Sequence, residues 1–200
     1  MRTFWELPPH ARLTMSYAGI GNRDIDGKTE PVSGKPLGSV MTWVAGELER
    51  IGYTLNSGGA AGSDAAFEAG VADPSHKNIF RAGDATNETR LIAREMHPTG
   101  DRLGGYVLDL FARNTFQVFG RGLDTPVDFV LCYTRDGCES QWTRTAMTGG
   151  TGQAIEMAAR KGSEIFNMKN RDWLGRLNYY LQRHGLVSAG ALLEIPGDLQ

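Results

Sequence analysis

Short apolar segments alternate along the chain with longer segments in which apolar residues recur at helical spacing. Residues 37–51 give the clearest helix pattern, because apolar positions recur every three or four residues and Gly52 follows as a C-terminal cap. Residues 127–133 form the most apolar run, which is typical of a strand buried on both faces of a parallel sheet. The same criteria predict strands at 13–18, 53–56, 77–80 and 164–168, and helices at 64–72, 87–96, 103–119, 153–161 and 172–183.

This order of elements predicts an α/β fold with a single Rossmann-like, doubly wound and mostly parallel sheet that carries helices on both faces. We expect one domain over residues 1–200, with a core at about 13–168 and a C-terminal helix and tail at 169–200. In such sheets the ligand lies beyond the carboxyl ends of the strands. Residues that directly follow the predicted strands are therefore the candidates for a functional site.

Composition and charge narrow the classes of function. Hydrophobic residues make up 40% of the chain and charged residues 22%, as in ordinary globular proteins. The formal net charge is −2, so a dedicated duplex-DNA binder is not expected and nucleic acid is a secondary candidate partner. Neither a membrane span nor a signal peptide is recognisable, so we expect a cytoplasmic protein that does not enter membranes. Cys132 and Cys138 lack a second Cys or His pair, so we expect no zinc site, no other metal and no cofactor.

Three glycine-rich turns follow predicted strands: GIGNR at 19–23, SGGAAGSD at 57–64 and TGGTGQAIE at 148–156. Glycine lets a ligand approach the main chain closely, and the exposed N–H groups at a helix N-terminus attract anions. One such turn alone is weak evidence, but three at the strand ends of one sheet predict a phosphate or nucleotide site. The candidate binding residues are Gly19, Gly21, Asn22, Arg23, Ser57, Gly58, Gly59, Ala60, Gly62, Ser63, Asp64, Asn114, Thr134, Thr148, Gly149, Gly150, Thr151, Gly152 and Gln153.

The sequence leaves two interpretations open for several of these residues. Arg23 either binds a ligand phosphate or pairs with a neighbouring aspartate at the surface. Asp64 either accepts a hydrogen bond from a ribose hydroxyl or caps the helix that follows. Arg113 and Asn114 place polar groups in the middle of an apolar helix pattern, which suggests a site or a break in the helix. The loop 134–148 is long for a strand-to-helix connection and predicts a lid, in which Trp142 either stacks on a base or packs against the domain.

The motifs resemble those of a known superfamily. AGIGNRDI at 18–25 and LNSGGAAGSD at 55–64 are similar to the turns of the nucleotide-sensing SLOG superfamily, above all to the Rossmann-like domain of DNA-processing protein A and its phage-encoded relatives. Arg113 and Asn114 resemble the Arg-Asn pair that opens a helix in that domain. The resemblance implies a nucleotide-type ligand. For a phage-encoded member it implies a protein that sequesters or senses a host-defence nucleotide signal in the host cytoplasm.

The third turn resembles a sister branch, the cytokinin-activating phosphoribohydrolases. Gly149, Gly150 and Gly152 coincide with that branch's glycine signature, and Glu156 coincides with its glutamate. The resemblance implies that Glu156 and Arg113 act on the N-glycosidic bond of a nucleoside monophosphate, and that the chain forms a homodimer or a higher homo-oligomer. Thr148 and Gln153 stand where that signature has proline and threonine.

Three hypotheses of function follow. The first is a module that binds a nucleotide, ADP-ribose or a cyclic nucleotide. The second is an N-glycosidic hydrolase that uses Glu156 and Arg113, and the third is a single-stranded DNA-binding accessory protein of recombination. We favour the first hypothesis. The net negative charge counts against DNA binding, and the two departures of the third turn from the phosphoribohydrolase signature count against catalysis.

Overall fold

The computed structural model describes residues 14–97 and 100–200, and these contain one five-stranded sheet in which neighbouring strands run parallel. The strand order is β3-β2-β1-β4-β5, so the chain starts in the middle of the sheet and winds outward in both directions. This is the Rossmann-like, doubly wound arrangement that the sequence predicts. The strands are β1 (Ser16–Gly21), β2 (Thr54–Ser57), β3 (Lys77–Ile79), β4 (Phe129–Tyr133) and β5 (Glu164–Asn167).

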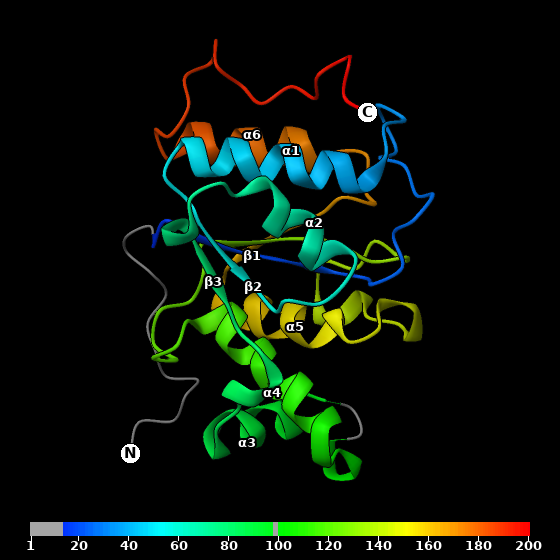
Figure 1. Cartoon of the computed structure of the whole chain (residues 1–200), viewed down its shortest axis with the longest axis vertical. Helices are drawn as coiled ribbons and strands as arrows, with labels where there is room; N and C mark the ends of the chain where they lie inside the picture. The colour runs from blue at the N-terminus through cyan, green and yellow to red at the C-terminus, as the bar shows by residue number, and fades with distance from the viewer. Residues whose placement is uncertain (1–13, 98–99) are drawn as a thin grey trace.

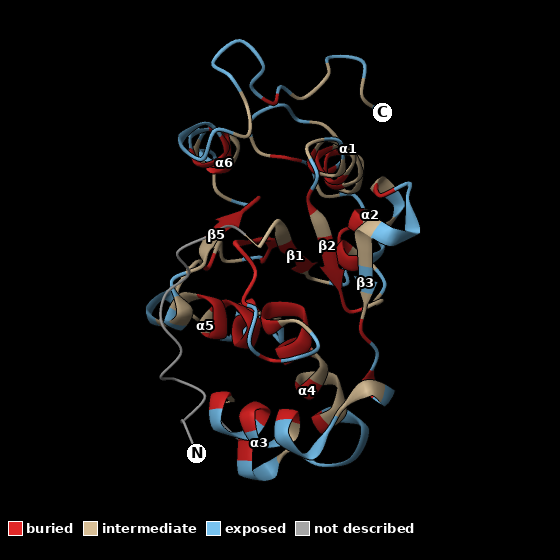
Figure 2. Ribbon diagram, turned by 90° about the vertical axis from the view of Figure 1, so that its left-hand side faces the viewer, coloured by how far each residue is buried: buried red, intermediate tan, exposed pale blue. Residues whose placement is uncertain are grey.

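Helices cover both faces of the sheet, as Figure 1 shows. One face carries α1 (Leu37–Arg50), α2 (Ser63–Gly70) and α6 (Trp173–Arg183). The other carries α4 (Gly105–Phe119) and α5 (Thr151–Lys161), with α3 (Asn87–Met96) packed on α4 as an outer layer. Figure 2 shows that the buried residues of these helices face the sheet or one another.

The strands are buried on both sides because successive side chains alternate between the two helical layers. Tyr17 and Phe129 pack beneath α1 and α6, whereas Ala18 and Val130 pack against the layer of α4 and α5. The predicted C-terminal helix is part of this core, since Trp173 is fully buried on α6.

The predicted elements are confirmed in number, type and order, with small shifts at their ends. The first strand, predicted at 13–18, is described from Ser16 to Gly21, and residue 13 lies outside the described residues. β4 begins two residues later than predicted, and the backbone N–H of Val127 bonds to the Val118 carbonyl at 2.8 Å instead of to a neighbouring strand. The Asp128 carboxylate accepts hydrogen bonds from the backbone N–H groups of Thr14 and Met15 at 2.7 and 2.9 Å. No helix in the part of the chain that the structure describes has the length and apolar character needed to cross a bilayer.

The strand order opens a crevice at the carboxyl ends of β1 and β4. β1 and β4 are neighbours, yet the chain leaves β1 toward β2 over one face and leaves β4 toward β5 over the other. The loops after these two strands therefore diverge and open a crevice at their carboxyl ends, the position at which doubly wound proteins bind ligands.

Candidate functional site

A pocket of about 640 Å³ occupies this crevice. The end of β1, the turn after β2, the inner face of α4 and the start of α5 all contribute to its walls, so segments far apart in the sequence meet there. Its lining residues are Ile20, Gly21, Asn22, Arg23, Asp24, Ala60, Asp64, Val107, Leu110, Phe111, Arg113, Asn114, Gln117, Arg135, Ala146, Met147, Gly149, Gly150, Thr151 and Ala154.

One wall of the pocket is the N-terminus of α5. Gly149 has a φ of +64°, which turns the chain sharply into the helix that begins at Thr151. No described residue accepts a hydrogen bond from the backbone N–H of Gly149, Gly150 or Thr151, and no side chain caps the helix. Three adjacent donors at the positive end of an 11-residue helix thus border the pocket without a protein partner. Such a wall can bind an anion.

The opposite wall is built by Arg113, Asp64 and the turn that contains Gly58. The Arg113 guanidinium donates a hydrogen bond to the Gly58 carbonyl oxygen, and its Nη2 lies 3.9 Å from the Asp64 carboxylate. That carboxylate accepts hydrogen bonds from the backbone N–H groups of Gly58 at 3.2 Å and Ala60 at 3.4 Å. A Cβ at position 58 would lie 2.6 Å from the Arg113 Cζ, so the close approach of the arginine requires glycine there. Asp64 therefore holds the turn together and does not cap α2.

Burial changes the charge balance of this wall. Removal from water raises the pKa of Asp64 from 3.8 to about 6, although Arg113 and the two backbone N–H groups act in the opposite direction. Burial also lowers the pKa of Arg113, while Asp64 beside it acts to raise it. The Arg113 Nε is buried and has no hydrogen-bond partner among the described residues. The wall thus holds a carboxyl group with a pKa of about 6 and an arginine whose buried Nε donor is unused.

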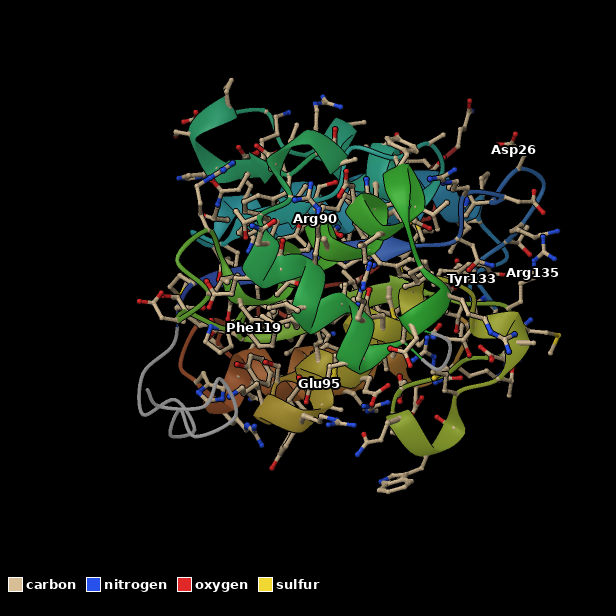
Figure 3. The ribbon with its side chains drawn as sticks, turned by 90° about the horizontal axis from the view of Figure 1, so that it is seen from below. Asp26, Arg90, Glu95, Phe119, Tyr133 and Arg135 are labelled. Carbon is tan, nitrogen blue, oxygen red and sulfur yellow. The ribbon has the colours of Figure 1, made fainter. Side chains whose placement is uncertain are left out.

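Charged residues gather at the mouth of the pocket. Arg135 pairs with Asp24 at 2.7 Å, and Figure 3 shows Arg135 and Tyr133 at the same edge of the molecule as Asp26 of the loop after β1. Arg23 is exposed and forms no ion pair with a described carboxylate. The alternative interpretation, in which Arg23 pairs with a neighbouring aspartate at the surface, is therefore not what the structure shows. The charge of Arg23 is near enough to Arg113 to lower the pKa of that side chain. Arg23 is therefore available to an anion at the mouth.

The floor of the pocket is neutral and buried. Ile20 and Ala154 supply apolar surface there, and Asn114 and Gln117 supply amides. Asn114 donates to the Gln153 side-chain oxygen at 3.2 Å, and Gln153 in turn donates to a backbone carbonyl of α3 at 3.3 Å. Gln117 is only 1% exposed, yet its Nε2 has no partner among the described residues.

Glu156 lies in a second pocket that adjoins the first. The two pockets share Phe111, Ala146, Gly149 and Gly150, but Arg113 lines only the first and Glu156 only the second. The Glu156 carboxylate is bound on both sides, by Arg144 at 3.0 Å and by Arg160 at 2.6 Å. The structure thus does not bring Glu156 and Arg113, the predicted catalytic pair, together in one pocket.

Of the predicted binding residues, nine line the first pocket and the other ten lie outside its lining. Gly58 binds Arg113 and Asp64, and Gln153 orients Asn114. The remaining residues pack inside the fold or tie its loops: Gly19 against Leu55 and Phe67, Ser57 to Glu68, Gly59 against Arg81, Gly62 against the Arg23 backbone, Ser63 to the Asn22 carbonyl, Thr134 to Asn167, Thr148 to Asp136, and Gly152 against Arg144.

The loop 134–148 is organised around Asp136. Its carboxylate accepts hydrogen bonds from the hydroxyls of Thr145 and Thr148, both at 2.5 Å. Burial acts to raise the pKa of Asp136, but these and other hydrogen bonds lower it. Trp142 is 86% exposed and borders the second pocket, so it does not pack against the domain.

Sequence reasoning did not assign several pocket residues to the site. Val107, Leu110, Phe111 and Gln117 join Arg113 and Asn114 on one face of α4, at spacings of three and four residues. Their helical spacing from Arg113 is the signal that could have found them. Among residues 14–97 and 100–200, no group of three or more His, Cys, Asp or Glu is arranged to hold a metal ion.

Fold and pocket together define a Rossmann-like α/β protein with a pocket at the point where the strand order reverses. Comparison of the chain with protein-family models, with curated proteins and with solved structures found no match. The similarity to the SLOG superfamily rests on the turn motifs given above, and the fold is compatible with it.

Proposed function

We propose that the first pocket binds a nucleotide or a nucleotide-derived phosphorylated small molecule, of the ADP-ribose or cyclic-nucleotide type. The observation that carries this proposal is the unpartnered N-terminus of α5 at the switch point of the sheet. Its three free N–H groups and the guanidinium of Arg23 border the same pocket. A phosphate placed there would accept charge-assisted hydrogen bonds, which are stronger than neutral ones.

The contacts of the arginines support a small ligand over a DNA strand. Arg135 and Arg144 pair with Asp24 and Glu156, and Arg113 lies beside Asp64. Only Arg23 among these four side chains lacks a described carboxylate partner. A DNA-binding groove needs several cations that can neutralise successive phosphates. One free arginine that lines the same pocket as a helix N-terminus suits one phosphate group.

The contacts of Glu156 favour binding of the ligand without turnover. A general acid or base must come within hydrogen-bond reach of the group on which it acts. Glu156 lines the adjoining pocket and already accepts hydrogen bonds from two arginines. A role in sequestering or sensing a host-defence nucleotide signal belongs to this proposal and requires the ligand to stay intact.

Calorimetry with AMP and adenosine tests the proposal directly. We expect AMP to bind and adenosine to bind at least tenfold more weakly, since only AMP carries the phosphate. Arg23→Ala should lower the affinity for AMP by about 10- to 100-fold without lowering the affinity for adenosine, because a hydrogen bond to a charged group contributes about 1.5–3 kcal/mol. Arg102→Ala is the matched control, an exposed arginine that does not line the pocket. Equal loss in both variants, or no binding of any nucleotide, would contradict the proposal.

A further inference from the structure

Gln117 combines two features that rarely occur together. Its side chain is almost completely buried, with 1% of its surface exposed, and its Nε2 lacks a hydrogen-bond partner among the described residues. A buried donor without a partner lowers the stability of the folded protein. Neighbouring amides are satisfied, since Asn114 bonds to Gln153 and Asn56 bonds to the Gln117 backbone carbonyl. The unused amide of Gln117 therefore calls for an explanation.

The surroundings of Gln117 give that explanation. The side chain lies on the pocket floor, one helical turn beyond Arg113 on the same face of α4. Ile20 and Ala154, 3% and 1% exposed, border the same pocket and provide apolar contacts there. The charged residues Arg23, Asp24 and Arg135 are exposed and lie toward the mouth. The exposed charges thus lie at the entrance of the pocket, while its floor is neutral and lies beside the buried pair of Arg113 and Asp64.

This polarity fixes the orientation of a nucleotide. Ala154 lies three residues after Thr151, so it is about 4.5 Å farther along the α5 axis than the free N–H groups. A phosphate at the helix N-terminus would leave the sugar and the base to extend toward the floor. An uncharged heterocycle matches the apolar surface and the single amide there, whereas a buried second phosphate would meet no unpaired cation on the floor.

We propose that Gln117 is the specificity-determining residue of this site and that it binds the edge of an adenine-type base. The inference rests on the function proposed above and adds the orientation of the ligand and the class of base. A glutamine amide offers a donor and an acceptor side by side. Adenine presents the complementary pair, the N6 amino group beside the N7 acceptor, and glutamine binds this edge through two hydrogen bonds. On the corresponding edge guanine presents two acceptors, N7 and O6, so it can form only one of them.

The experiment compares ligands and variants of the full chain by calorimetry. The ligands are AMP, GMP, purine riboside 5′-monophosphate, which lacks the amino group, and ribose 5-phosphate, which lacks the base. Gln117→Met removes the amide and keeps the shape of the side chain. Gln182→Met on α6 is the control, because Gln182 is an exposed glutamine away from the pocket.

For the wild-type chain we expect AMP to bind about tenfold or more tightly than GMP and than purine riboside 5′-monophosphate. In Gln117→Met these ratios should fall toward one, while ribose 5-phosphate binds unchanged. The ligand-free variant should also melt a few degrees higher than wild type, because it no longer buries an unpaired donor.

Three results would overturn the inference. The first is a wild-type chain that binds GMP or the amino-free purine as well as AMP, a result that needs no variant. The second is an unchanged preference for AMP in Gln117→Met. The third is a lower melting temperature of that variant, which would make Gln117 a structural residue. In each of these cases, binding of a phosphorylated ligand still supports the proposed function. If none of the four ligands binds, both the proposed function and this inference are wrong.

Discussion

The carboxyl group of Asp64 gives the sharpest physical prediction, because two opposing effects act on it. Burial raises its pKa from 3.8 to about 6, while Arg113 at 3.9 Å and the backbone N–H groups of Gly58 and Ala60 act to lower it. Burial prevails, so the folded chain keeps a proton on Asp64 in the range between about pH 4 and 6, where the unfolded chain has released it. This group therefore favours folding most below pH 4, and its contribution falls as the pH rises through 6.

The size of the effect follows from the difference between the two pKa values. Two pKa units correspond to about 3 kcal/mol of unfolding free energy. In Asp64→Asn the charge is gone, but the side-chain oxygen can still accept from Gly58 and Ala60. The stability of wild type relative to Asp64→Asn should therefore fall by about 2.5 kcal/mol between pH 4 and pH 7, because a part of the full difference is already lost at pH 4. Other titrating groups cancel in this difference, because both proteins contain them.

Urea unfolding of the two proteins at half-unit steps from pH 4 to pH 8 measures the difference. Asp136→Asn is the matched control. Its pKa is lowered by hydrogen bonds in spite of burial, so its stabilising effect is present above pH 4 and is lost only at lower pH. The control difference should stay level across the range. A level difference for Asp64→Asn, or one that rises with pH, would refute the reasoning and would mean that Arg113 outweighs burial.

Two further predictions concern Glu156 in the second pocket and Gly62 in the turn that also contains Asp64. Glu156→Gln removes ion pairs with Arg144 and Arg160 and should lower the free energy of unfolding in urea by about 1–2 kcal/mol. The affinity for AMP, measured by calorimetry, should change less than about twofold. A tenfold loss of affinity would place Glu156 in the ligand site. Gly62→Ala should destabilise by about 3 kcal/mol or more in the same unfolding assay, because Gly62 has a φ of +81° and a Cβ would overlap the Arg23 backbone. Gly185→Ala, with a φ of +72° and open space around it, should cost about 1 kcal/mol, and equal losses at both positions would contradict the packing argument.

The fold could be predicted from the sequence because local and global signals agree. The α1 stripe of Leu37, Val40, Met41, Val44 and Leu48 is fully buried, as its helical spacing predicts. The apolar run of β4 is buried on both faces, as a central parallel strand requires. The exact ends of strands were less predictable, since the residues next to β4 form tertiary hydrogen bonds, such as those of the Asp128 carboxylate to Thr14 and Met15, which are 114 and 113 residues away in sequence.

The candidate site was predicted only in part, and helical geometry explains one of the gaps. Successive residues of an α-helix are rotated by about 100°. Ala154 lines the first pocket, so Glu156, two positions later, points about 200° away and faces the second pocket together with Arg160. The motif resemblance groups Glu156 with Arg113, but the rotation along α5 separates them. The missing partner of Gln117 could not be predicted, because it depends on which tertiary neighbours come within reach.

The glycine-rich turns after β2 and before α5 differ in the hydrogen-bonding groups that they leave free. In the turn after β2, Ser57 bonds to Glu68, Ser63 bonds to the Asn22 carbonyl, and Asp64 and Gly58 are occupied with each other and with Arg113. In the turn before α5, the N–H groups of Gly149, Gly150 and Thr151 have no described acceptor. A ligand gains most from groups that do not have to give up a protein partner. The first turn therefore acts mainly by positioning Arg113, and we expect the binding free energy of a phosphate to come mainly from the second turn and Arg23.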